Sequence, residues 1–201
     1  MEKLSKDECV ESDEVTKVLL DHIDILTDTA NEFSTFAKLS TEEHSLIDLD
    51  ALLQEEISMF DNKDNIQFNY MGLMGAEVMA PKPQLTRVFV NLISNAVQAV
   101  EISQQEALDA GREPARGRIM VSLRNSSADG FYDIVVEDNG PGVSPENQSR
   151  LFTPNFTTKN GGTGLGLAIC RSILERCDAE IFYSKSFALE GACFTVRYPK
   201  G

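Results

Sequence analysis

The chain has little positive charge, no tryptophan and no long apolar run. Its 201 residues include 18 Lys and Arg against 32 Asp and Glu, which gives a net charge of −14. Nucleic-acid binding needs clustered basic residues, so this balance argues against a nucleic-acid partner. No stretch approaches the roughly 20 apolar residues of a membrane helix, and the acidic start does not resemble a secretory signal. We expect a cytoplasmic chain, whose parent protein could still carry a membrane anchor.

The cysteines are few and show no metal-binding or redox spacing. Cys9, Cys170, Cys177 and Cys193 form no C-x-x-C pair, and Cys170 and Cys193 lie in apolar stretches. This pattern favours buried, reduced thiols of a cytosolic protein, with a disulfide pair as the alternative.

The first segment predicts an acidic helix over about residues 13–39. One apolar stripe follows spacings of three and four along it: Val15, Val18, Leu19, His22, Leu26, Ala30, Phe33, Phe36 and Ala37. Such a helix needs a partner to be stable. It either packs on its own domain or forms half of a helical hairpin that dimerises. Residues 39–43 look like a boundary, so we expect one unit over residues 1–42 and a second over 43–201.

The second unit predicts an α+β fold with strands in one layer and helices in the other. Short strands are expected over residues 46–49, 66–70, 77–79, 119–123, 132–137, around 181–183, and 193–198. Helices are expected from an Asp50 N-cap to about Phe60, over residues 83–103, and from about Gly164. Residues 104–117 read as a helix extension followed by a loop. The strands should form a mixed, mainly antiparallel sheet.

The helix over residues 83–103 carries two unusual asparagines. Its apolar positions make it buried on much of its circumference, and Asn91, Asn95 and Gln98 lie along one edge of that buried face. Asparagine has poor helix propensity and must find hydrogen bonds when buried. Two of them one turn apart therefore indicate a site that they serve.

A glycine-rich run precedes the last predicted helix. Gly162, Thr163, Gly164, Leu165 and Gly166 combine a flexible backbone with the positive end of a helix dipole, which suits a phosphate group. A tight turn without a ligand is the alternative. The run lacks the lysine of a P-loop, does not follow a Rossmann strand, and has no later H-R-D segment of a protein kinase.

Asp138 ends an apolar strand and is followed by Asn139, Gly140, Pro141 and Gly142. An aspartate before Asn-Gly is common in turns. The other interpretation is a carboxylate that accepts a hydrogen bond from an exocyclic amine such as that of adenine. The residues alone leave both interpretations open.

Four segments in order resemble the N, G1, F and G2 boxes of bacterial sensor histidine kinases: NLISNAVQAV from Asn91, EDNGPGV from Glu137, LFTPNFTTK from Leu151, and GGTGLGLAI from Gly161. The last residues, GACFTVRYP from Gly191, resemble the family's closing strand. The resemblance covers about residues 46–199. It implies the Bergerat α/β sandwich shared with gyrase-type and chaperone ATPases.

The resemblance also implies roles for individual residues. Asn95 matches the asparagine that ligates Mg²⁺ on the ATP triphosphate, and Asn91 should lie near the metal or the phosphates. Asp138 matches the carboxylate that recognises adenine, and Gly140 and Gly142 let the chain turn beneath the base. Further expected contacts are Lys159 as a basic residue of the phosphate lid, the amides of Gly162, Thr163, Gly164, Leu165 and Gly166, and, less directly, Thr195 near the adenine.

Two positions depart from the family's pattern. Asn155 stands where an aromatic residue often precedes Phe156, so the lid could pack differently. The N box ends in Ala96-Val97-Gln98-Ala99, without the basic residue that other branches use to touch phosphate. This ending resembles the branch related to nitrogen-regulation kinases.

Neither histidine fits the family's phosphoacceptor motif. His22 is followed by Ile23 rather than by an acidic residue and has no nearby proline, and His44 lies in the boundary segment. The segment before Leu39 looks instead like the second helix of the acceptor hairpin, so the resemblance implies that the receiving histidine lies outside this chain. The implied partners are that histidine domain, a response regulator, and a second copy through the first helix.

The implied function is the catalytic domain of a histidine kinase, and three alternatives stay open. One is an ATPase of the same fold, although Asn91 stands where such enzymes use a glutamate base. The others are a serine-directed kinase and a module that binds partners without nucleotide.

Overall fold

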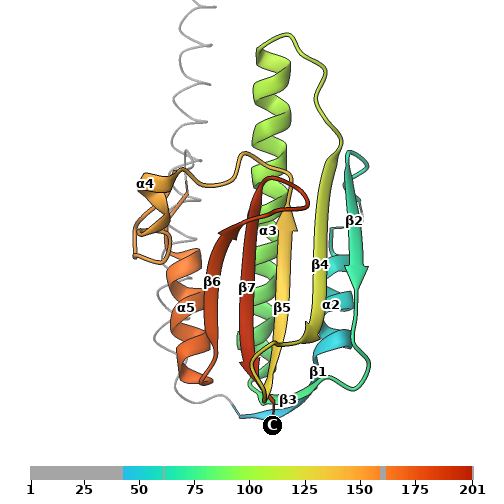
Figure 1. Ribbon diagram of the computed structural model, residues 1–201, viewed down its shortest axis with the longest axis vertical. Helices are drawn as coiled ribbons and strands as arrows, with labels where there is room; N and C mark the ends of the chain where they lie inside the picture. The colour runs from blue at the N-terminus through green and yellow to red at the C-terminus, as the bar shows by residue number, and fades with distance from the viewer. Residues whose placement is uncertain (1–42, 61, 159–161, 201) are drawn as a thin grey trace, which may run out of the picture.

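The computed structural model describes residues 43–60, 62–158 and 162–200. The predicted unit over residues 1–42 lies outside the described residues. The described elements run in the following order (Figure 1): β1 Ser45–Asp48, α2 Leu49–Ser58, β2 Ile66–Met71, β3 Glu77–Ala80, α3 Lys82–Asp109, β4 Gly117–Asn125, β5 Phe131–Asp138, α4 Pro145–Gln148, α5 Gly166–Arg176, β6 Glu180–Lys185 and β7 Ala192–Pro199.

Five strands form the main sheet in the order β2-β4-β5-β7-β6, and β1 pairs with β3 in a separate two-stranded sheet. Only the β2–β4 pair of the main sheet is parallel, and β4–β5, β5–β7 and β6–β7 are antiparallel. The expected mixed, mainly antiparallel sheet is confirmed. The β1–β3 pair departs from the single layer of strands that the sequence suggested.

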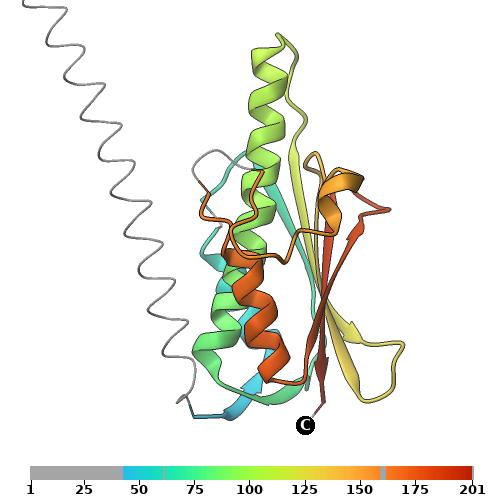
Figure 2. The same cartoon turned by 90° about the vertical axis from the view of Figure 1, so that its left-hand side faces the viewer.

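The helices α2, α3 and α5 lie together on one face of the main sheet (Figure 2). The strands alternate accordingly, because successive side chains of a strand point to opposite faces. In β4, Ile119, Val121 and Leu123 are buried under the helices, while Arg118 and Arg124 are exposed. The two-layer α+β sandwich that the sequence predicts is therefore confirmed.

Helix α2 begins at Leu49 with Asp48 as its N-cap, two residues before the Asp50 cap that the sequence predicts. The Asp48 Oδ1 atom accepts hydrogen bonds from the backbone N–H groups of Asp50 (2.9 Å) and Ala51 (3.2 Å). Asp50 makes a long-range contact instead. Its Oδ1 accepts from the Tyr70 hydroxyl (2.7 Å) and the Leu73 N–H (3.1 Å), which ties α2 to the end of β2.

Helix α3 is the longest described element and the centre of the core. Its buried apolar residues repeat at helical spacing, as the sequence predicts: Leu85, Val88, Phe89, Leu92, Ile93, Ala96, Val97 and Val100. Gln84 is buried as well. The helix continues beyond Ser103 to Asp109, which confirms the expected extension. Gly111 then adopts φ 66°, a left-handed conformation that ends the helix.

Two local features near the end of the chain differ from expectation. The last helix begins at Gly166 and not at Gly164, because Gly164 has φ 67° and cannot join a right-handed helix. The sequence did not indicate α4, a single turn that begins at Pro145.

The cysteines that the structure describes are free thiols, as the sequence favoured. Cys170 is buried, whereas Cys177 and Cys193 are half-buried, so the expectation of full burial fails for Cys193. Within residues 43–60, 62–158 and 162–200, no helix has the length and apolar character to cross a bilayer.

Replacing Leu92 by alanine should destabilise the domain strongly. Leu92 is fully buried beneath the sheet, and Leu→Ala substitutions at such positions cost about 2–5 kcal/mol. The measurement is the free energy of unfolding in urea. Leu108→Ala is the matched control, since Leu108 lies on the same helix with 54% of its surface exposed and should change stability by about 0.5 kcal/mol or less. Equal losses for the two variants would contradict the assignment of the core face.

Candidate functional site

A cavity of about 680 Å³ opens between α3, the loop after β5, the segment before α5 and the start of β7. Its walls come from all four segments that the sequence singled out. The predicted site residues that line it are Asn91, Asn95, Asp138, Gly142, Gly162, Thr163, Gly164 and Gly166.

One face of α3 forms the longest wall of the cavity. Its lining residues follow helical spacing over five turns: Arg87, Asn91, Ser94, Asn95, Gln98, Ala99, Ile102 and Glu106. The Nδ2 group of Asn95 donates a hydrogen bond to Oδ1 of Asn91 at 2.9 Å. This bond fixes the orientation of both amides, and the two asparagines act as one polar unit beside the apolar core.

Asp138 lines the cavity with only 2% of its surface exposed. Its Oδ1 atom accepts hydrogen bonds from the backbone N–H groups of Gly140 (2.9 Å) and Ala192 (3.1 Å). A buried carboxylate is stable only where such donors surround it. The hydrogen bond to Gly140 belongs to the expected turn, and the second one joins the turn to β7, so Asp138 both holds the loop and faces the cavity.

Close backbone packing around Asp138 explains two glycines. A Cβ on Gly140 would lie 2.8 Å from the Cβ of Ala99 on α3. A Cβ on Gly191 would overlap the carbonyl oxygen and Oδ1 of Asp138. Sequence reasoning had not given Gly191 a role. The loop after β5 thus lies directly between α3 and the start of β7.

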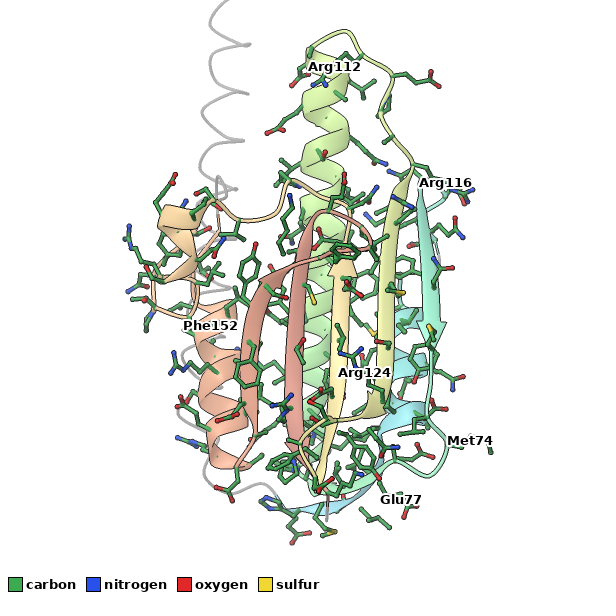
Figure 3. All side chains as sticks on the ribbon, in the orientation of Figure 1. Met74, Glu77, Arg112, Arg116, Arg124 and Phe152 are labelled. Carbon is green, nitrogen blue, oxygen red and sulfur yellow. The ribbon has the colours of Figure 1, made fainter. Side chains whose placement is uncertain are left out.

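An aromatic cluster supports the wall behind Asp138. The Tyr183 hydroxyl accepts a hydrogen bond from the Val143 N–H at 3.1 Å, and the Tyr183 and Phe194 rings lie 5.4 Å apart. Phe152 packs edge-on against Phe194 at 6.5 Å, and Figure 3 shows Phe152 beside the first turns of α5. Burial, together with the charge of Asp138, raises the pKa of Tyr183 despite the hydrogen bond from Val143. The phenol therefore stays protonated at neutral pH and available to hold the loop.

The glycine-rich run packs against α3 through its backbone. A Cβ on Gly166 would overlap the side-chain amide of Asn91, and a Cβ on Gly164 would lie 2.7 Å from the backbone of Asn155. The Thr163 Oγ1 atom accepts a hydrogen bond from the Leu165 N–H at 3.4 Å. The start of α5, where the first backbone N–H groups have no partner within the helix, therefore lies next to the asparagine pair.

The remaining predicted residues occupy different places. Gly140 and Leu165 do not line the cavity themselves: Gly140 packs beneath it, and Leu165 packs on the core and precedes α5. Lys159 lies outside the described residues. Thr195 is wrongly assigned to the adenine region, since the alternation of β7 puts Thr195 on the far face of the sheet, between Val135 and Phe182.

The sequence analysis missed several lining residues. Ala192 and Phe194 take the place expected for Thr195, because their side chains point to the helix face of β7. Arg87, Ile102 and Glu106 were also missed as part of the site. Extending the Asn91–Asn95 spacing along α3 in both directions would have found these three.

The donor set suits a magnesium ion that a substrate shares. Among the described residues, no group of three or more His, Cys, Asp or Glu could hold a metal. Mg²⁺ often takes only one or two protein oxygens and completes its shell with phosphates and water. The oriented Asn95 amide on the cavity wall fits that mode of binding, and it does not fit a metal cage built from protein ligands alone.

Residues 81–201 match the family described as histidine kinase-, DNA gyrase B- and HSP90-like ATPases. The chain belongs to this ATPase family. The match includes all four motifs that line the cavity, so the resemblance noted in the sequence is confirmed at the level of the family.

Relatives among characterised proteins carry sensor-kinase names. The chain is 30% identical to the sensor histidine kinase ZraS of Salmonella typhimurium over 94% of its own length and 38% of that protein. It is 28% identical to the signal transduction histidine-protein kinase AtoS of Escherichia coli, over 92% of the chain and 29% of that protein. The chain therefore spans less than two fifths of the length of these relatives.

Solved structures agree with the fold of this ATPase family. The catalytic domain of the histidine kinase ThkA, in a nucleotide-free form, superposes with a TM-score of 0.65 at 28% identity, and the match covers 79% of the chain and 96% of that domain. Full-length ShkA in complex with AMPPNP gives a TM-score of 0.71 at 23% identity over 94% of the chain and 39% of ShkA. The second comparison supports the fold alone.

Replacing Gly191 by alanine should damage this region more than a change at an open turn. The new methyl group would collide with Asp138, whose carboxylate is already held by Gly140 and Ala192. We expect a loss of about 2 kcal/mol or more in the free energy of unfolding. Gly130→Ala is the control, because Gly130 has φ 83° and open space around it. An alanine there would clash with nothing and would lose about 1–2 kcal/mol of stability through its left-handed backbone conformation alone. Similar losses, measured by urea unfolding, would argue against the close packing described.

Proposed function

We propose that this chain is the ATP-binding catalytic domain of a two-component sensor histidine kinase, which transfers the γ-phosphate of ATP to a histidine outside the chain. The main support is the oriented Asn91–Asn95 pair beside the glycine-rich start of α5, with a buried Asp138 in the same cavity. Family membership adds ATP as the substrate class.

In this proposal Asp138 recognises the adenine base. A carboxylate held by two backbone N–H donors is fixed in orientation, so it can accept a hydrogen bond from an exocyclic amine with little loss of entropy. A nucleobase with a carbonyl oxygen in place of the amino group of adenine would be repelled, because the carboxylate and the carbonyl oxygen are both hydrogen-bond acceptors. Gly142, at φ 70°, carries the chain under the base without a side chain in the way.

The opposite part of the cavity holds the phosphates. The N–H groups from Gly162 to Gly166 and the positive end of α5 favour an anion there. Asn95 would ligate Mg²⁺, which neutralises phosphate charge when it is bound. We assign Lys159 a phosphate contact by sequence alone, because its positive charge would help an acidic chain to hold phosphates.

Transfer to a histidine is favoured over hydrolysis. Hydrolysis requires a group that activates water, and Asn91 is a neutral amide that cannot accept a proton in that role. A neutral imidazole is already a nucleophile and needs no strong base. Positioning and charge neutralisation then account for most of the catalysis, which agrees with what this cavity provides.

The acceptor histidine and the response regulator are partners outside this chain. His44 is exposed just before β1, and His22 lies outside the described residues. The sensor-kinase names of the relatives support a histidine domain, an aspartate-bearing response regulator and a cytoplasmic location. We also propose that residues 1–42 provide one helix of the dimerisation hairpin.

Nucleotide binding should depend on both ends of the cavity. We expect the chain to bind a fluorescent ATP analogue in the presence of Mg²⁺, and Asp138→Asn to weaken binding about tenfold or more, since a hydrogen bond to a charged group is lost. Asn95→Ala should weaken binding only while Mg²⁺ is present. After a chelator is added, the variant and the unmodified chain should bind the analogue with the same affinity. Asp129→Asn, in the exposed β4–β5 turn, is the control with the same chemical change. Unaltered affinity in Asp138→Asn and Asn95→Ala would refute the site.

The chain alone should take up little stable label from γ-labelled ATP. The receiving histidine lies elsewhere in this proposal, so His22→Ala and His44→Ala should leave the small signal unchanged, and ATP hydrolysis should be slow. Phosphoprotein is measured after denaturing gels, and free phosphate in parallel. Strong labelling that disappears in His22→Ala would place the acceptor within this chain. Rapid multiple-turnover hydrolysis would favour the ATPase alternative.

A further inference from the structure

Along α3, the positive lining residue of the cavity lies at one end, and the negative ones lie toward the other. Among the described lining residues, Arg87 is the positive one, and Glu106 and Asp138 are the negative ones. Arg87 and Glu106 are separated by five turns of α3, or roughly 28 Å along the helix axis at about 1.5 Å per residue. The cavity therefore has an electrostatic direction along α3.

Contacts between the loops and α3 show which end of the cavity lies near Asp138 and which lies near the glycine-rich run. Gly140, beside Asp138, packs against Ala99, whereas Gly166 packs against Asn91. Arg87 comes one turn before Asn91, roughly 6 Å further along the axis and away from Ala99. A nucleotide whose base lies at Asp138 and whose phosphates lie at Gly162 to Gly166 would therefore extend its terminal phosphate toward Arg87.

The arginine also has the chemistry for this position. Arg87 is half-buried on the cavity wall. The carbonyl of the next residue, Val88, accepts a hydrogen bond from Cys170 Sγ of α5 at 3.9 Å, so this turn of α3 lies against α5. The ion pairs of the described residues join Lys63–Glu101, Lys82–Glu55, Arg171–Glu175 and Arg197–Asp133, so none of them involves Arg87. A guanidinium group offers several N–H donors in one plane and matches a phosphate with two hydrogen bonds at once.

We propose that Arg87 binds the γ-phosphate of ATP and so completes the phosphate site from the α3 side. This inference rests on the proposed function and adds a contact specific to the terminal phosphate. The sequence motifs do not include Arg87, which precedes the first of them. Its charge lies where the transferred group leaves the nucleotide, so the same contact also neutralises charge on that group during transfer.

The test compares ATP with ADP, because only ATP carries the terminal phosphate. We expect Arg87→Gln to raise the Kd for Mg²⁺-ATP about tenfold and the Kd for Mg²⁺-ADP less than twofold, as measured by calorimetry. Arg87→Lys should recover part of the ATP affinity, since it keeps the charge and loses the planar group. Glutamine and arginine have similar helix propensities, so α3 should stay intact, which circular dichroism can check.

Arg112→Gln is the matched control, since it removes the same charge beyond the far end of α3, where Figure 3 shows Arg112 well away from α5. It should alter neither affinity. Equal effects of Arg87→Gln on ATP and ADP, or no effect on either, would overturn the γ-phosphate contact. Asp138→Asn should weaken ATP and ADP alike and so reports the base end independently. If the unmodified chain binds neither nucleotide, the proposed function itself fails, and the inference fails with it.

Discussion

The packing of α3 against the sheet is the constraint on which the rest of the molecule depends. The same helix buries Leu85, Leu92 and Ile93 in the core and presents Asn91 and Asn95 to the cavity. A rotation of the helix would therefore disturb the core and the site together. Because protein cores are packed at crystal-like density, the core holds the polar face of α3 in a fixed orientation.

The two loops that frame the cavity take their positions from contacts with this helix. Gly140 fits against Ala99, and Gly166 fits against the side chain of Asn91, so neither loop can move closer or carry a larger residue there. The Gly191 backbone then fills the space beside Asp138. These three glycines let both loops pack closely against the core and so fix where the loops lie. Each position requires glycine because a side chain would clash there, and not only because glycine is flexible.

The sequence predicted most of the fold because its helices and strands have clear periodicity. The buried face of α3 and the alternation of β4 follow directly from spacing. The errors arose where the outcome depends on contacts distant in sequence. Asp50 looked like a helix cap, yet it binds Tyr70 and Leu73, while Asp48 caps the helix. Gly164 likewise has a positive φ and lies close to the backbone of Asn155, and the glycine pattern alone could show neither feature.

The candidate site was predicted less completely, and the reason is physical. Motif residues such as Asp138 and Asn95 are recognisable because their chemistry is unusual in their local context. Ala192 and Phe194 are ordinary strand residues, and only the pairing of β7 with β5 brings them to the cavity. Thr195 was misassigned for the same reason, since a shift of one residue in a strand moves a side chain to the other face of the sheet.

The charge of the chain bears on how the cavity selects its ligand. A net charge of −14 repels polyanions in general, so any phosphate group must be bound by local donors rather than by the overall field. In the proposed site, backbone N–H groups at the start of α5 would hold the phosphates without adding a mobile side chain, and the carboxylates of Asp138 and Glu106 would disfavour a phosphate near them. For the proposed nucleotide, this distribution of charge therefore favours one orientation in the cavity over the reverse. In an acidic domain, orientation of the ligand follows as much from where negative charge lies as from where positive charge does.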